Sequence, residues 1–287
     1  MSLKYDLHTH STASDGTLSP AALVARAAAA QVDVLALTDH DTTAGVAEAA
    51  AEADRLGVHL IAGVEVSVTW ESRVVHVLGL GVDPQCETLQ TGLAKLVEFR
   101  DWRAEEMGRR LEKEGIPGMF DGAKGLSNGR LISRTHFARF MVEQGHVTSV
   151  RKVFQRYLVQ GKPGYVNGRW AELEEAVSWI RAAGGQAVIA HPARYRLTRT
   201  GLRRLLDEFK GAGGAGLEVI SGSHSRDDNY RMAAFARDFA LLASAGSDYH
   251  GPENPWIDLG RLPELPDSCV PVWRDWVTVD CRKICQH

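Results

Sequence analysis

The stretch YDLHTHSTASD, residues 5–15, begins as a strand and runs into a small polar loop. Tyr5 and Leu7 alternate with Asp6, and side chains two residues apart on a strand point to the same side. His8 and His10 therefore present two imidazoles side by side where the strand ends. Imidazole is the commonest protein ligand for metals. Taken alone, the pair leaves open a metal chelate or two structural histidines.

The composition is that of an ordinary globular protein, with 44% hydrophobic and 24% charged residues in a chain of 287. This length allows one large domain or one domain with an insertion. The net charge of −3 provides no general attraction to nucleic acid or membranes. No apolar run reaches the ~18–20 residues of a membrane span, and no signal peptide is evident. We expect a cytoplasmic protein, and nothing here implies a protein partner.

Apolar runs alternate with helical patterns, which predicts an α/β fold with a parallel sheet. The predicted strands are residues 5–8, 34–38, 59–68, 74–81, 186–190, 216–221 and 241–245. The predicted helices between them are residues 19–30, 44–56, 171–183, 200–210 and 226–239.

Residues 87–168 interrupt this alternation. They read as mostly helical, with helices expected at 87–114, 134–144 and 149–159 and a glycine-rich loop at 118–129. We therefore expect residues 1–86 and 169–287 to form the main domain, and residues 87–168 to form a helical insertion that caps the substrate.

Histidines and carboxylates follow nearly every predicted strand. The carboxyl ends of parallel strands meet at one rim, where active sites assemble. A structural origin for such a cluster is hard to find, because buried unpaired imidazoles cost desolvation energy and offer packing nothing. The candidate metal ligands are His8, His10, Asp15, His40, Glu65, His76, His191, Asp248 and His250.

These six histidines and three carboxylates exceed the needs of one ion. At roughly three or four ligands per open site, they suit about three ions, with Glu65 shared between two. Imidazole and carboxylate without thiolate favour Mn²⁺, Fe²⁺ or Zn²⁺ in catalytic sites. Three divalent ions would outweigh the carboxylates and one hydroxide by about two positive charges, which favours a phosphate dianion as substrate.

The same residues resemble the PHP family, the polymerase and histidinol phosphatase phosphoesterases. The similarity covers residues 5–82 and 170–255 and is carried by His8-x-His10, Thr38-Asp39-His40, Ala190-His191-Pro192 and Ser247-Asp248-x-His250, together with Asp15, Glu65 and His76. It implies a distorted seven-stranded β/α barrel with a trinuclear metal centre.

The resemblance also implies how the ligands are shared. His8, His10, Glu65 and Asp248 would hold one metal. Glu65, His76 and His191 would hold a second, and Asp15, His40 and His250 the third. A hydroxide bridging two metals would attack phosphorus, whereas the general acid stays unassigned.

Within the family, the chain is similar to members with a helical insertion that remove the 3′-phosphate of nucleoside 3′,5′-bisphosphates, such as adenosine 3′,5′-bisphosphate. Related members are 5′→3′ exonucleases on short RNA, and histidinol phosphate phosphatases share the site. A non-catalytic metal-binding module and a metallo-amidohydrolase are the alternatives from other classes.

Basic side chains near the predicted rim are candidates for holding the phosphates, since guanidinium groups suit oxyanion pairs. The candidates lie at a helix start and in rim loops, and they are Arg134, Thr135, Arg194, Lys162, His224 and Arg226. Phe99, Trp102 and Arg103 share a helix face and could stack a base while Arg103 reaches a phosphate. Asp39 could orient an imidazole, relay protons or cap its loop.

Overall fold

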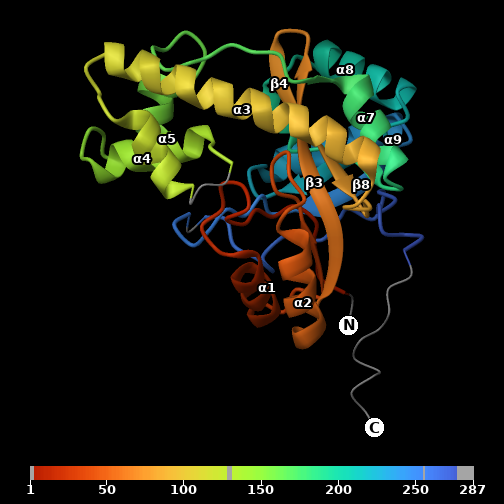
Figure 1. Ribbon diagram of the computed structural model, residues 1–287. Helices are drawn as coiled ribbons and strands as arrows, with labels where there is room; N and C mark the ends of the chain where they lie inside the picture. The colour runs from red at the N-terminus through yellow and green to blue at the C-terminus, as the bar shows by residue number, and fades with distance from the viewer. Residues whose placement is uncertain (1–2, 128–130, 255, 277–287) are drawn as a thin grey trace.

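The computed structural model describes residues 3–127, 131–254 and 256–276, and its strands form a barrel-like sheet surrounded by helices (Figure 1). The strands are short except for the pair that forms the central hairpin. They are β1 (Tyr5–Asp6), β2 (Val34–Leu37), β3 (His59–Trp70), β4 (Arg73–Leu80), β5 (Ala171–Glu172), β6 (Gln186–Ile189), β7 (Gly216–Ser221) and β8 (Leu242–Gly246).

Seven strands follow one another around the barrel in the order β1-β2-β3-β4-β6-β7-β8. The first and last of them meet, because the backbone N–H of Leu7 donates to the carbonyl of Ala245 at 2.9 Å. Thr9 and Tyr249 pair just beyond. The predicted distorted seven-stranded β/α barrel is confirmed.

The expectation of an all-parallel sheet is wrong at β4, which is antiparallel to both β3 and β6. A tight hairpin joins β3 to β4, so β4 begins at the rim where the parallel strands end. His76 therefore lies near the start of its strand, not at the end as expected. A short strand, β5, was also missed: it pairs with β3 and precedes the helix expected at 171–183.

Helices cover the outside of the barrel and begin and end at residues that suit those positions. Ser19 accepts a hydrogen bond from the Ala22 N–H and is followed by Pro20, as expected of a helix start. Gly57 ends the second helix in the left-handed region. These helices are α1 (Pro20–Ala29), α2 (Val46–Leu56), α7 (Leu173–Ala182), η2 (Pro192–Tyr195), α8 (Arg199–Gly211) and α9 (Arg226–Asp238).

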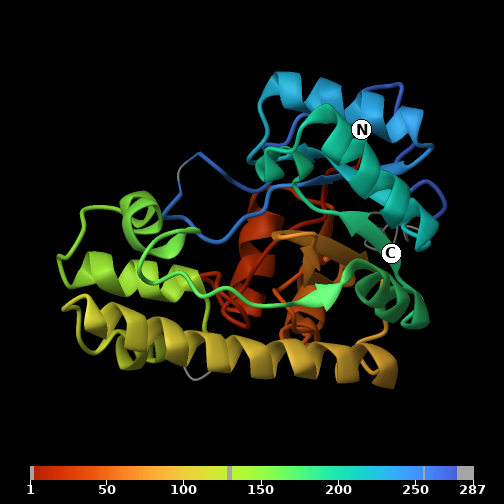
Figure 2. The same ribbon diagram turned by 90° about the horizontal axis from the view of Figure 1, so that it is seen from above.

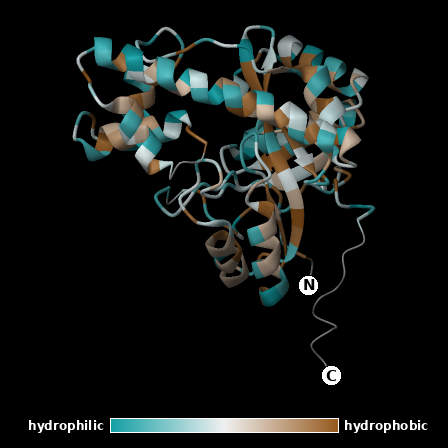
Figure 3. Cartoon of the chain, viewed as in Figure 1, coloured by the Kyte–Doolittle hydropathy of each residue, from teal (hydrophilic) through white to brown (hydrophobic). Residues whose placement is uncertain are grey.

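Apolar residues concentrate on the strands and on the inner faces of these helices, as the brown colouring in Figure 3 shows. The largest buried cluster joins β3, β4, β6, β7 and β8 to α7, α8 and α9. A second cluster packs α1 and α2 against β2. Burial of these side chains at about 25 cal/mol per Å² of apolar surface holds the barrel together.

Residues 87–168 lie beside the barrel and have a hydrophobic cluster of their own (Figure 2). The loop expected at 118–129 is wrong, because the residues described there form a helix that packs on the cluster through Met119 and Ala123. The elements are α3 (Glu87–Lys113), α4 (Met119–Leu126), α5 (Arg134–Glu143), α6 (Val150–Val153) and the π-helix η1 (Phe154–Leu158).

A buried ion pair joins α3 to the barrel. Arg100 donates through Nε to Asp41 Oδ2 at 2.6 Å and through Nη2 to Ser67 Oγ at 2.8 Å. Asp41 also accepts the backbone N–H of Ser67 at 2.6 Å. This buried ion pair and the packing of Leu89, Leu93 and Leu96 in the largest cluster together hold α3 against the barrel.

In the part of the chain that the structure describes, no helix has both the length and the apolar character needed to cross a bilayer.

Closure of the barrel depends on a glycine. A Cβ at Gly246 would meet the Cβ of His8 and would lie 2.7 Å from Glu218 Oε1. We expect Gly246→Ala to lower the free energy of unfolding by about 1–3 kcal/mol, because β8 and β1 must move apart. Urea denaturation measures the change.

The matched control is Gly125→Ala in α4, where an added Cβ would have no neighbour within 4 Å. This change should leave stability equal or higher by up to about 1 kcal/mol, since alanine is the better helix former. Equal stability of the two variants would contradict the role given to Gly246.

Candidate metal centre

The loop after β1 places two imidazoles side by side, with their ring centres 5.1 Å apart and their planes tilted by 54°. Thr9, between them, donates through Oγ1 to the Ala36 carbonyl at 2.7 Å and through its backbone N–H to Thr38 Oγ1 at 3.1 Å. His8 and His10 consequently turn to the barrel rim, with their Nε2 atoms 3.1 Å apart. Both side chains are fully buried. A Cβ at Gly16 would meet the backbone carbonyl of His10, so this loop requires glycine there.

Glu65, fully buried on β3, stands at the middle of the cluster. Its Oε1 lies 2.9 Å from His76 Nδ1 and 3.0 Å from His191 Nε2. Its Oε2 lies 2.9 Å from His40 Nδ1. The same Oε2 lies 3.4 Å from His8 Nε2 and 3.3 Å from His10 Nε2. One carboxylate therefore faces two separate groups of imidazoles, one with each oxygen.

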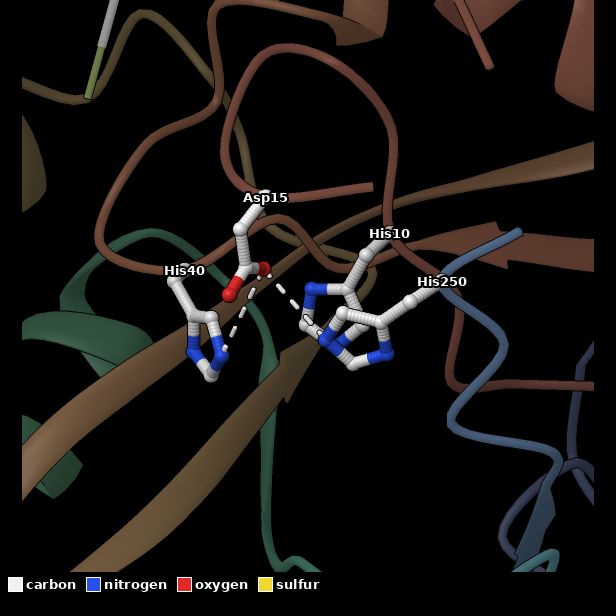
Figure 4. Close-up of side chains that lie close together, drawn as sticks. All are labelled: His10, Asp15, His40 and His250. Carbon is white, nitrogen blue, oxygen red and sulfur yellow. Dashed lines mark ion pairs between the residues drawn. The ribbon is translucent and has the colours of Figure 1, made fainter. Parts of the chain in front are cut away.

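Asp15 and His250 form a second meeting point with His10 and His40 (Figure 4). Asp15 Oδ1 lies 3.3 Å from His250 Nε2 and 3.9 Å from His40 Nε2. Its other oxygen accepts a hydrogen bond from Thr135 Oγ1 at 2.9 Å. A residue of α5 thus fixes the orientation of a carboxylate that belongs to the barrel.

Asp248 brings the end of β8 into the cluster. Its Oδ1 lies 3.4 Å from His8 Nε2, 3.3 Å from His10 Nε2 and 3.6 Å from His250 Nδ1. Its Oδ2 accepts from Arg194 Nη1 at 2.6 Å. Asp248 and His191 both have positive φ, 58° and 29°, and such backbone strain persists where the surroundings impose it, often at functional sites.

These donor atoms fit bound cations. An ion holds nitrogen and oxygen ligands at about 2.0–2.2 Å, so neighbouring ligand atoms lie roughly 3–3.5 Å apart, and the distances given above between ligand atoms run from 2.9 to 3.9 Å. Glu65 Oε2, Asp15 Oδ1 and His40 Nδ1 are buried without a hydrogen bond. Unpaired lone pairs of this kind are costly unless a cation satisfies them. Four overlapping groups could hold an ion: His10, Asp15, His40 and His250; His8, Glu65 and His191; His8, His10 and Asp248; His40, Glu65 and His76.

The protonation states of the carboxylates and of His10 and His191 suit metal binding. Against the effect of burial, the neighbouring carboxylates raise the pKa of His8, His40 and His250, the last to about 9, so these three rings must release a proton to coordinate a metal. Burial opposes ionisation of the Glu65 carboxyl, but the nearby histidines hold its pKa well below the usual value. The same balance lowers the pKa of Asp15 and Asp248. Burial lowers the pKa of His10 and His191 to about 3, which keeps both rings neutral at pH 7. Carboxylates and neutral imidazoles are the forms that coordinate metals.

A buried carboxylate that the sequence analysis missed supports two of these histidines. Glu218, on β7, accepts from His8 Nδ1–H at 3.0 Å and from the His191 backbone N–H at 2.5 Å. The first bond leaves His8 Nε2 free to face the cluster. The sequence did indicate Glu218, since it is the one charged residue in the apolar run GLEVIS.

Asp39 contacts a loop and no imidazole among the described residues. Its carboxylate accepts from the Ser11 N–H at 2.8 Å, from Ser11 Oγ at 2.6 Å and from Ser14 Oγ at 2.6 Å. Burial raises its pKa to about 6. These contacts correspond to the loop-capping alternative, and they hold the segment between His10 and Asp15 in place.

A cavity of about 390 Å³ opens over the cluster and is lined on its other side by residues of the insertion. Arg103, Arg134, Thr135 and Arg194, all candidates from the sequence, line it. Burial and the neighbouring Arg134 lower the pKa of Arg103 to about 9. Among the described residues, no carboxylate pairs with Arg103 or Arg134, so their charges are available to an anion.

The other candidates for substrate contact lie elsewhere. Trp102 is 50% exposed and does not line the cavity, and the ring of Phe99 packs edge-on against Trp170. Phe99 and Trp102 do lie side by side, with ring centres 5.5 Å apart, but of Trp102 and Arg103 only Arg103 lines the cavity. Lys162 is exposed outside the cavity lining, and His224 and Arg226 line a different cavity next to Tyr230.

Comparison with known proteins places this cluster in a family. The family model described as PHP domain matches residues 6–189. A Chromobacterium violaceum protein named 3′,5′-nucleoside bisphosphate phosphatase is 52% identical over 94% of this chain and 95% of its own length. A Haemophilus influenzae protein named 5′-3′ exoribonuclease is 46% identical over 95% of this chain and 99% of its own.

Solved structures agree in fold. An amidohydrolase from Chromobacterium violaceum, with bound sulfate and no metal, is 52% identical and superposes with a TM-score of 0.91 over 94% of this chain and 95% of its own. A structure from Bifidobacterium adolescentis, assigned as a metal-dependent phosphoesterase, is 29% identical with a TM-score of 0.83 over 93% of this chain and 94% of its own.

Replacing Glu65 tests the centre directly. Glu65→Gln keeps the shape but offers one oxygen where the carboxylate offers two, so the variant should retain fewer ions per chain and lose activity by about 100-fold or more. Elemental analysis of folded, metal-reconstituted protein measures the ion content.

Glu174→Gln is the control, since Glu174 is an exposed glutamate on α7 outside the cluster. It should keep the wild-type ion content. An unchanged ion content in Glu65→Gln would show that Glu65 binds no metal.

Proposed function

The chain belongs to the PHP domain family and is a metal-dependent phosphoesterase, and we propose that it removes the 3′-phosphate of nucleoside 3′,5′-bisphosphates. Adenosine 3′,5′-bisphosphate would give the 5′-monophosphate and inorganic phosphate. Water supplies the oxygen of the new P–O bond, and the ribose 3′-oxygen leaves with a proton. The relative named 3′,5′-nucleoside bisphosphate phosphatase supports this choice at 52% identity.

The proposal rests on Arg103 and Arg134, two arginines that line the cavity and have no carboxylate partner among the described residues. Arg103 is only 8% exposed, and the Arg134 guanidinium also lines the cavity. Arg103 is buried and Arg134 is half-buried, and such charges without a carboxylate partner cost desolvation energy unless an anion joins them. A bisphosphate provides that anion, because one phosphate can lie at the cluster while the other lies between the arginines.

We propose three divalent ions, with Mn²⁺ the best suited. The ligand sets are His8, His10 and Asp248 with Glu65 Oε2; His76 and His191 with Glu65 Oε1; and Asp15, His40 and His250. The two faces of Glu65 and the position of Asp15 support this division. When bound, such ions stabilise charge on the phosphate and lower the pKa of water.

The protein's own groups bind and orient the substrate. Arg134 and Arg103 hold the phosphate that does not react, which fixes the distance of the second phosphate from the cluster. Arg194, which donates to Asp248, belongs to the barrel and also lines the cavity, so it can donate to the reacting phosphate. We further propose that residues 87–168 act as a substrate-capping subdomain, since Arg103, Arg134 and Thr135 all come from it.

A second candidate is 5′→3′ exonuclease activity on short RNA, which the 46%-identical relative named 5′-3′ exoribonuclease favours. The 5′-phosphate and the first phosphodiester of a short RNA would provide two anionic groups, as a nucleoside bisphosphate does. Histidinol phosphate carries one phosphate and would leave the arginines unmatched, and a neutral amide would match neither part of the cavity.

A substrate panel separates these activities. We expect metal-loaded protein to release phosphate from adenosine 3′,5′-bisphosphate with a kcat/KM at least about tenfold above those for adenosine 3′-monophosphate and histidinol phosphate, because only the bisphosphate uses both sites. The measurement is inorganic phosphate release, with 5′-phosphorylated di- and trinucleotides analysed by product chromatography. A higher kcat/KM for the oligonucleotides would replace the first proposal with the second.

Replacing an arginine tests the second phosphate site. Arg134→Met keeps an unbranched apolar stem but removes the guanidinium group and its charge, so KM for adenosine 3′,5′-bisphosphate should rise roughly 10- to 100-fold. KM for adenosine 3′-monophosphate should change little, because that compound lacks the second phosphate.

Arg139→Met is a control on the same helix, outside the cavity lining. An equal rise in KM for both substrates with Arg134→Met would speak against a dedicated site for the second phosphate.

A further inference from the structure

Part of the cavity is lined by groups that neither the cluster nor the arginines use. Phe154, Val159, Gln160 and Tyr165, which we call the aromatic wall, line it on the side of η1. Val159 is an apolar side chain that is 38% exposed, and the Phe154 and Tyr165 rings are half-buried. These groups carry no charge and two of them are aromatic rings, so they suit an uncharged planar ligand better than a phosphate.

The aromatic wall adjoins the arginine pair. The Arg134 guanidinium carbon lies 5.7 Å from the centre of the Phe154 ring. Tyr165 is one residue from Val166, whose carbonyl accepts from Arg103 Nε at 3.4 Å. A molecule whose phosphate lies between these arginines therefore has its next group beside the aromatic wall.

The backbone holds this wall in shape. The Val159 N–H donates to the Phe154 carbonyl at 3.1 Å, the five-residue step of a π-helix. Such turns are rare and occur frequently at functional sites. The Tyr165 carbonyl accepts from Arg110 Nη1 at 2.5 Å, and the Gly164 N–H donates to the Tyr157 carbonyl at 2.8 Å. The loop after η1 is thus tied back to α3 and to η1.

The other aromatic residues nearby are already occupied or point elsewhere. Arg100 and Arg103 lie over the Trp170 ring, 4.8 Å and 5.6 Å from its centre, and Phe99 meets its edge. Trp102 lies outside the cavity lining. Arg134 likewise lies over the Phe154 ring, so the aromatic wall offers a ligand the rest of that half-buried ring and the Tyr165 ring, which makes no ring or cation contact with the described residues.

We propose that the aromatic wall binds the nucleobase of the substrate, with the base against Phe154 and Tyr165 and the Gln160 amide at its edge. Base–aromatic stacking and apolar contact supply affinity. An amide can donate to adenine N7 and accept from adenine N6, which favours adenine. The inference rests on the proposed function, because it takes the phosphates of the same nucleotide to lie at the arginines and the cluster.

The test compares a nucleotide with the same sugar phosphate lacking its base. With metal-loaded protein, Phe154→Leu should raise KM for adenosine 3′,5′-bisphosphate roughly tenfold. KM for 1-deoxyribose 3,5-bisphosphate should stay within about twofold of the wild-type value, because this compound has no base to contact Phe154. Phe154→Leu keeps an apolar side chain against the insertion's own cluster, and circular dichroism checks the fold.

Two further variants sharpen the result. Trp102→Ala, an exposed aromatic of the same subdomain, should leave KM for both compounds unchanged. Gln160→Leu should reduce the preference for adenosine over uridine bisphosphate about threefold or more, with kcat for the abasic compound unchanged. Equal effects of Phe154→Leu on the two compounds, or no effect on either, would overturn the assignment.

A binding measurement separates this inference from the proposed reaction. Titration calorimetry of 5′-AMP and ribose 5-phosphate into metal-loaded protein should give a tighter Kd for 5′-AMP, and Phe154→Leu should remove most of that difference. This result would stand even if the protein released no phosphate from the bisphosphate. Equal affinity of the two ligands for the wild-type protein would reject the base site.

Discussion

One buried carboxylate is the constraint on which the rest of the structure depends. Glu65 has no exposed surface, and five imidazoles approach its two oxygens within 3.4 Å. Such a charge is stable in the interior only when positive groups surround it. The strands and loops of the barrel supply those groups, and the neutral rings of His10 and His191 favour cations over protons in that role.

In the proposed function, the barrel and the helical insertion contribute different groups to the binding of a phosphate ester. The barrel holds the cluster, and α3 and α5 bring unpaired arginines to the opposite wall. Two contacts fix this arrangement: Arg100 with Asp41, and Thr135 with Asp15. The second contact reaches a candidate metal ligand, so a movement of α5 would also disturb the cluster. In this proposal, substrate binding and metal coordination therefore depend on the same contacts.

Sequence patterns predicted the α/β fold and the strand-end cluster because both follow from local rules, whereas the barrel was expected from the family resemblance. His8-x-His10 reads directly as two rings on one side of a strand. Partners that are distant in the chain were harder to foresee. The reversal of β4 follows from a tight hairpin, and Glu218 is recognised only once His8 lies beside it. Helical spacing placed Trp102 and Arg103 together, but it could not tell which of them would face the cavity.

The meeting of β1 with β8 has a consequence for how the protein is made. Leu7 pairs with Ala245, and the candidate ligands run from His8 to His250. During translation, His8 and His10 therefore leave the ribosome well before Asp248 and His250 do. Binding of cations by the complete ligand set requires that the chain has been translated through His250, so a loaded centre shows that the barrel has closed.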